Sequence, residues 1–93
     1  MDDLQRPDLR VVARILGTLW ESQRSMRPTQ LQQAARTNYT QFSRYLDLLV
    51  SRGLVLVRTD EGGGQWIELT RTGYEAHQFL VKGIHDLFAR RTK

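Results

Sequence analysis

The segment of residues 28–57, PTQLQQAARTNYTQFSRYLDLLVSRGLVLV, limits the possible folds of this chain more than any other part of its sequence. Thr29 and Asn38 each precede a glutamine by three residues, which is the spacing of a helix cap and its partner. The second of these starts opens an apolar run at helical spacing that ends at Gly53, a residue type common just after a helix. Apolar and β-branched residues follow. The segment therefore predicts a short helix, a tight turn, a second helix and a strand.

The predicted helix over residues 39–52 has one apolar side and one polar side. Steps of about 100° per residue put these residues on the inward side: Tyr39, Phe42, Tyr45, Leu46, Leu49 and Val50. The same steps put these polar residues on the opposite side: Thr40, Gln41, Ser43, Arg44, Asp47 and Ser51. We expect the apolar side to pack on a core and the polar side to face solvent or a partner.

A helix and two strands are predicted on either side of this segment. Asp8 can cap a first helix over residues 8–23, whose apolar face carries Leu9, Val12, Ile15, Leu16, Leu19 and Trp20. Residues 54–59 and 66–69 predict strands joined by a hairpin with three consecutive glycines. A phosphate-binding loop needs a lysine and a helix after its glycines, whereas a strand follows here. The glycines therefore predict a turn.

The last predicted helix covers residues 70–91, and Thr70 can cap it. It carries two apolar stripes, one with His77, Leu80, Ile84 and Leu87 and the other with Tyr74, Val81 and Phe88. One stripe is enough to dock a helix on a small domain, so the second predicts an antiparallel helix pair with another copy. The alternative is one wide stripe buried within a single monomer. Under the dimer hypothesis the interface residues are Tyr74, His77, Val81, Ile84 and Phe88.

The positive charge of the chain is concentrated in one segment. The formal net charge is +4. Residues 24–58 hold six arginines and one aspartate, a net charge of +5, while the rest of the chain sums to −1. The positive excess therefore lies on the predicted helix-turn-helix unit, where a polyanion would dock.

The composition excludes several classes of protein. Ninety-three residues fit one domain, which we take as residues 1–93. The chain has no cysteine and its two histidines are eight residues apart, so we expect no metal site and no cofactor. Because no set of catalytic side chains is apparent, we predict that it is not an enzyme. No apolar run approaches the roughly 20 residues that cross a bilayer, and the first residues lack a secretion signal, so we expect a cytoplasmic protein.

These patterns together resemble the winged helix-turn-helix superfamily. The resemblance covers about residues 9–88 and rests on Asn38-Tyr39-x-x-Phe42-x-x-Tyr45-Leu46-x-x-Leu49, Arg52-Gly53-Leu54-Val55 and Leu69-Thr70-x-x-Gly73. The chain looks most like the small archaeal winged-helix regulators, a group that includes basic chromatin-type proteins that dimerise through a C-terminal helix pair. The resemblance implies a mainly α (α+β) fold. It comprises a three-helix core and a two-stranded β-hairpin wing in residues 9–69, and a C-terminal dimerisation helix in residues 70–91.

The resemblance also implies which residues read DNA bases, because the second helix of this motif enters the major groove with its N-terminal part. The residues nearest the bases are then Thr40, Gln41, Ser43, Arg44 and Asp47. Arg44 can pair with guanine, Gln41 with adenine and Asp47 with a cytosine amino group. Two alternatives stay open, namely an ion pair between Arg44 and Asp47 and a capping role for Gln41.

Other residues are expected to hold the DNA backbone. Around the shorter helix these are Arg27, Thr29, Gln30 and Arg36, and on the wing strand it is Arg58. The wing tip carries Asp60 and Glu61, which repel phosphate. We therefore expect the tip to stay out of the minor groove.

Three functions compete for this sequence. The first is a homodimeric transcriptional regulator that reads the major groove with the helix 39–52. The second is a chromatin-type architectural protein with low sequence specificity, and the third is a winged helix that serves as a protein–protein interaction module. The positive segment favours the first two, with double-stranded DNA as partner in a cytoplasmic, nucleoid-associated setting. A ligand site near Trp20 or Tyr74 stays an open alternative, and no small-molecule effector is indicated.

Overall fold

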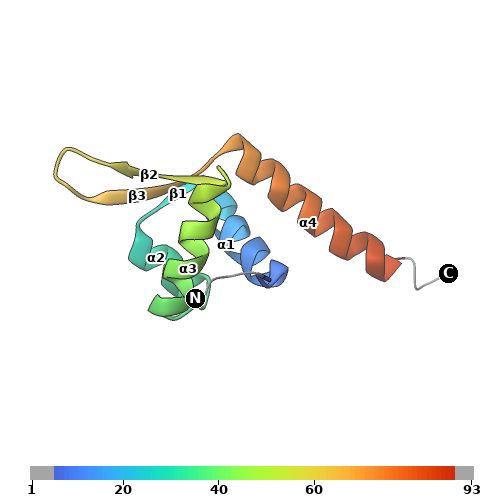
Figure 1. Ribbon diagram of the computed structural model, residues 1–93. Helices are drawn as coiled ribbons and strands as arrows, with labels where there is room; N and C mark the ends of the chain where they lie inside the picture. Colours follow the sequence, from blue (N-terminus) through green and yellow to red (C-terminus); the bar gives the residue numbers. More distant parts are fainter. Residues whose placement is uncertain (1–5, 90–93) are drawn as a thin grey trace.

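The computed structural model describes residues 6–89, and its side chains are described as far as residue 83. It contains, in chain order, α1 (Leu9–Glu21), β1 (Ser25–Met26), α2 (Pro28–Ala34), α3 (Tyr39–Ser51), β2 (Val55–Thr59), β3 (Gln65–Leu69) and α4 (Arg71–Ala89). The three strands form one antiparallel sheet in the order β1-β3-β2. In Figure 1 the β2–β3 hairpin extends to one side of the helices α1, α2 and α3, and α4 runs past α1 to the other side.

The core lies where α1 meets the other elements. Three residues of α1, Ile15, Leu16 and Leu19, have no exposed surface. They belong to one buried cluster with residues from every other major element up to β3, including Leu31, Ala35, Phe42, Tyr45, Leu49, Val55, Ile67 and Leu69. Helix α2 has only seven residues and could not form alone, so its packing on this cluster stabilises it. The predicted three-helix core and hairpin wing are confirmed.

Four residues predicted on apolar inward faces are exposed instead. Leu9 exposes 57% of its surface and Tyr39 exposes 73%, and Trp20 and Val50 are also exposed. All four stand in the first or last turn of their helices. A small core covers only the middle turns of each helix, so a helical-wheel position does not by itself bury a terminal residue.

Helix α3 begins and ends as predicted, whereas α2 begins earlier. The Asn38 side chain accepts a hydrogen bond from the Gln41 N–H at 2.7 Å, and Gly53 follows the helix with φ of +72°. The predicted cap of α2 at Thr29 is wrong, because Pro28 occupies the first helical position. The cap residue is therefore Arg27, whose backbone N–H donates to Gln30 Oε1 at 3.4 Å.

The two-residue strand β1 was not predicted. It pairs with β3 through Ser25 opposite Glu68 and Met26 opposite Ile67. Just before it, Gln23 and Arg24 have φ of 61° and 81°, so the chain turns sharply between α1 and the sheet. Neither the short strand nor left-handed backbone at a glutamine and an arginine has a strong sequence signal.

The start of α4 is fixed to the end of α3. Thr70 Oγ1 accepts from the Gly73 N–H at 2.9 Å, as its predicted capping role requires, and donates to the backbone oxygens of Gly53 and Leu54 at 2.7 and 3.0 Å. The absence of a side chain at Gly73 matters here, because a Cβ at this position would overlap the Leu54 carbonyl oxygen. Gly73 therefore permits the close approach of α4 to the start of the wing.

We predict that Gly73→Ala lowers the free energy of unfolding by about 1–3 kcal/mol, because the new methyl group displaces the Leu54 backbone. Gly83→Ala is the matched control, since a Cβ at Gly83 would meet no atom within 4 Å. That change should raise the free energy of unfolding by up to about 1 kcal/mol through helix propensity. Chemical denaturation followed by circular dichroism measures both. Equal effects of the two substitutions would contradict this account of Gly73.

Candidate nucleic-acid interface

The polar residues predicted to read bases lie together on one face of α3. Thr40, Arg44 and Asp47 are exposed, and Gln41 and Ser43 are partly buried. A shallow hollow of about 340 Å³ brings three of them together, and its lining residues are Asn38, Thr40, Gln41, Arg44 and Tyr45. A second hollow, between α2, α3 and the wing, includes Thr29 and Ser43 in its lining. The structure thus brings Thr40, Gln41 and Arg44 together in the N-terminal half of α3, whereas Ser43 lines the second hollow and Asp47 lies farther along the helix.

The structure narrows two open alternatives, the capping role of Gln41 and the ion pair between Arg44 and Asp47. The cap of α3 uses the backbone N–H of Gln41 and the side chain of Asn38, so it does not require the Gln41 side chain. Arg44 and Asp47 both lie in the described part of the chain, and they form no ion pair there. Both side chains therefore point to solvent without the competing role that the sequence left open.

Three residues expected at the DNA backbone lie on the exposed surface of α2 and its following turn. Thr29 and Gln30 occupy the first turn of α2, and Arg36 stands in the turn between α2 and α3. Arg36 is exposed and has φ of 60°, a left-handed conformation that L-residues adopt at a cost. The turn itself is supported by Arg14, whose Nε donates to the Ala35 carbonyl at the end of α2 at 2.6 Å. The role of Arg14 was not foreseen, because it joins residues 21 positions apart.

Arg27 is held against the tip end of the wing, where β2 ends and β3 begins. Its guanidinium lies 4.1 Å from the centre of the Trp66 ring, within the range of a cation–π interaction. It also lies 3.4 Å from Asp60 Oδ2 and donates to the Gln65 backbone oxygen at 3.4 Å. These contacts link the cap of α2 to the hairpin, so they set the position of the wing relative to the helices.

Asp60 organises the hairpin. Its Oδ1 accepts hydrogen bonds from the N–H groups of Gly62 and Gly64 at 3.0 and 2.8 Å, and its Oδ2 accepts from Trp66 Nε1 at 3.1 Å. The Gly64 N–H, the Trp66 indole and the nearby Arg27 guanidinium lower the pKa of the Asp60 carboxyl below its ordinary value of 3.8. The sequence suggested only that this acid repels phosphate; its structural role depends on contacts that the fold creates.

Arg58 stands on β2 with its guanidinium 3.2 Å from Glu68 Oε2 on the neighbouring strand. Its side chain is about two-thirds exposed, so this ion pair is solvated and weak. Arg58 therefore keeps access to a partner anion, in contrast to Arg27.

The predicted dimer residues divide into two groups along α4. Tyr74 packs against Trp20 of α1 with ring centres 4.6 Å apart and ring planes tilted by 43°, and His77 lies against Gly17 of α1. These two residues thus pack within one chain, as the single-monomer alternative expected for this part of α4. Val81 is 46% exposed. The side chains of Ile84 and Phe88 lie outside the described residues, although the helix backbone continues to Ala89.

One exposed aromatic residue of α4, Phe79, belongs to neither of the two predicted stripes. Phe79 exposes 76% of its surface. At about 100° per residue it falls on the opposite side of the helix from both stripes, so neither stripe included it.

No group of His, Cys, Asp or Glu residues able to hold a metal ion occurs among the described residues, and none of the described helices is long and apolar enough to cross a membrane.

We predict that Asp60→Ala loosens the hairpin with little loss of global stability, because the acid bonds only to exposed hairpin groups and Arg27. The indole N–H resonance of Trp66 should move toward the position of a solvent-exposed tryptophan. In the unaltered protein the same resonance should titrate with a midpoint below pH 3.8, because the pKa of Asp60 is lowered in the folded state. The stability that the Asp60 carboxylate contributes is therefore fully present above pH 3.8 and is lost as the pH falls through the folded-state pKa. Glu61→Ala is the control and should leave the resonance in place.

Comparison with known proteins places this geometry in a structural class. No family model matches the sequence, and no curated protein is similar enough to count as a relative. The structure is similar to that of Sso10a-2, a DNA-binding protein from Sulfolobus solfataricus, with a TM-score of 0.73, 21% sequence identity, and coverage of 94% of this chain and 90% of that chain.

Two further similar structures are those of longer regulators. One is MepR, a transcription regulator of the Staphylococcus aureus multidrug efflux pump MepA, with a TM-score of 0.75, 17% identity, and 88% of this chain covered. The other is a MarR family transcriptional regulator from Silicibacter pomeroyi, with a TM-score of 0.72, 23% identity, and 89% of this chain covered. The chain spans 62% and 56% of the lengths of these two proteins. At these identities the likeness establishes the fold alone, and that fold is the winged helix.

Proposed function

We propose that this chain is a DNA-binding transcriptional regulator that acts as a homodimer and places α3 in the major groove. The observation that carries the proposal is the polar face of α3, where Arg44 is exposed and unpaired among the described residues beside Thr40 and Gln41. An arginine in this position at the N-terminal half of a recognition helix can contact guanine. Its fold is that of proteins described as DNA-binding or as transcription regulators.

Charge supports this proposal over an interaction module. Residues 24–58 contain six arginines. Two of them form ion pairs with acidic residues in the described part of the chain, Arg27 with Asp60 and Arg58 with Glu68. Arg36, Arg44 and Arg52 are exposed and form no such pair among the described residues. The +5 segment therefore presents uncompensated positive charge to a polyanion. Because of this positive charge we also propose that the protein is cytoplasmic and associated with the nucleoid.

A homodimer is proposed from the shape and surface of α4. The helix packs on α1 near Tyr74 and His77 and then continues beyond the helical body in Figure 1. On its described part it exposes Val81, a member of the predicted interface stripe. A helix with exposed apolar residues that extends from its own domain is stabilised by a second copy, and two copies bring two recognition helices to one DNA duplex.

We predict a steep dependence of DNA affinity on salt, because each neutralised phosphate contributes a slope of roughly −0.9 to the log–log plot. Arg44→Ala should cost about 1–3 kcal/mol on the preferred sequence and relax the preference at one base pair. Arg36→Gly should make the slope of log affinity against log salt shallower by the contribution of about one phosphate, whatever the DNA sequence. That substitution also relieves a left-handed backbone position, so any loss of binding does not come from unfolding.

Fluorescence anisotropy over a range of salt concentrations measures these effects, and Arg10→Ala is the charge-matched control. Arg10 stands on α1 in an exposed pair with Asp8, outside the proposed surface. A flat salt response, or no binding at low salt, would contradict DNA binding and favour a protein–protein interaction module. Specific and non-specific affinities within about tenfold of each other would favour an architectural protein, since regulators typically discriminate by 10³ or more.

We predict that the protein has a solution mass of twice its chain mass of 10.8 kDa, and that Val81→Glu shifts it to the monomer because a charge in an apolar contact between copies is costly. Phe79→Glu adds the same charge on the opposite side of α4 and should leave the dimer intact. Light scattering coupled to gel filtration measures both masses. A monomer in the unaltered protein would contradict the homodimer without bearing on DNA binding.

A further inference from the structure

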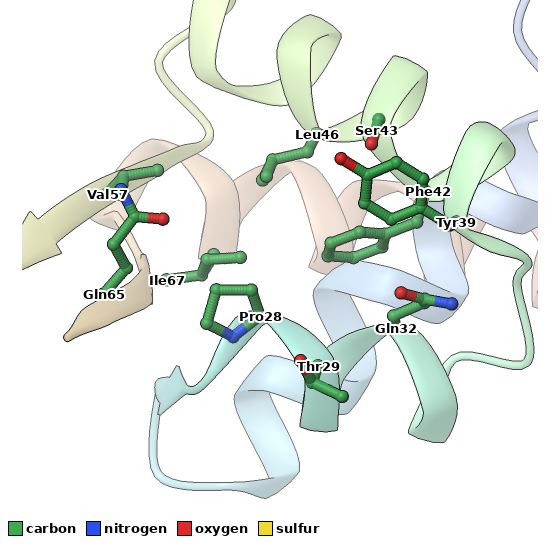
Figure 2. A pocket seen from close by; sticks show the side chains of 10 residues that line it. All are labelled: Pro28, Thr29, Gln32, Tyr39, Phe42, Ser43, Leu46, Val57, Gln65 and Ile67. Carbon is green, nitrogen blue, oxygen red and sulfur yellow. The ribbon is translucent and has the colours of Figure 1, made fainter.

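A hollow of about 220 Å³ opens between α2, α3 and the wing. Figure 2 shows the rings of Tyr39 and Phe42 at one end of this hollow, with Val57 and Gln65 at the opposite end and Pro28 between them. Four of its ten lining residues are aliphatic or proline, two are aromatic and four are polar. Its lining residues are Pro28, Thr29, Gln32, Tyr39, Phe42, Ser43, Leu46, Val57, Gln65 and Ile67.

Tyr39 is the unexplained residue at this hollow. Its apolar spacing predicted a core position, yet 73% of its surface is exposed at the first position of α3. Phe42, three residues later, is buried and completes the core behind it. The fold therefore leaves the Tyr39 ring available to a partner, beside Val57, which is also exposed at 40%.

The position of the hollow indicates what occupies it. Two of its lining residues, Thr29 and Ser43, belong to the set expected to face DNA. Arg44 directly follows Ser43 on α3, and Arg36 is exposed in the turn before this helix, so a negatively charged partner is drawn to this side of the molecule. A DNA major groove presents one apolar group to a protein, the 5-methyl group of thymine.

We propose that this hollow is a subsite for the thymine methyl group, with the Tyr39 ring as its apolar wall. The inference rests on the proposed function, since it takes DNA as the partner, and adds the base feature that the protein selects. Arg44 supplies charge and hydrogen bonds to the duplex, whereas Tyr39 contributes by removing apolar surface from water. Burial of one methyl group corresponds to about a fourfold gain in affinity at each occupied position.

Thymine and uracil differ only in this methyl group, so the test compares two duplexes of the same sequence. The duplex is recovered by selection from random DNA with the unaltered full chain, and is then prepared with thymine or with uracil at every such position. The unaltered protein should bind the thymine duplex about fourfold more tightly for each methyl that it contacts. Tyr39→Ala should reduce this ratio toward one, and Tyr39→Phe, which keeps the ring and loses the hydroxyl, should retain it.

The comparison of ratios between variants separates the Tyr39 contact from any change that uracil makes to the duplex itself. Binding of both duplexes by the unaltered protein with no thymine preference would overturn this inference and leave the proposed function standing. The same holds if Tyr39→Ala weakens both duplexes equally, which would make Tyr39 a backbone contact. Failure of the unaltered protein to bind either duplex at low salt would instead refute the proposed function. Circular dichroism of each variant checks that α3 is retained.

Discussion

Burial of the apolar face of α1 is the interaction on which the rest of this structure depends. Ile15, Leu16 and Leu19 supply completely buried side chains, and the core residues of α2, α3 and the sheet join the same cluster. A seven-residue helix and a hairpin lack the cooperativity to form alone, so both acquire their positions from this contact. The polar face of α3 is turned outward because the apolar face of the same helix packs on this cluster.

The wing illustrates how local charges change meaning inside a fold. Taken along the sequence, Arg27 is a basic residue beside a helix-turn-helix unit and Asp60 is an acid at a hairpin tip. In the structure each is engaged by the other and by Trp66, so both serve the geometry of the wing. Arg36, Arg44 and Arg52, which are exposed and form no ion pair among the described residues, lie in the turn before α3, on α3 and at its C-terminal cap. The proposed contact therefore centres on α3 and not on the hairpin tip.

Helix α4 serves two purposes along its length. Its first turns complete the monomer, because Tyr74 packs against Trp20 and Gly73 allows close contact with Leu54. Its next turns expose Phe79 and extend from the helical body (Figure 1). Apolar spacing reveals a stripe but not the neighbour that covers it. Tyr74 and His77, predicted at a contact between copies, therefore contact their own α1 instead.

The sequence alone determined the features that depend on neighbours within a few residues. The cap at Asn38, the helix end at Gly53 and the Thr70 start of α4 were all predictable, because such hydrogen bonds and left-handed turns are local. Only the tertiary structure decided the exposure of Tyr39 and the engagement of Arg27 by Asp60. Those outcomes depend on where a small core ends and on contacts between distant residues, and residue order does not encode either of them locally.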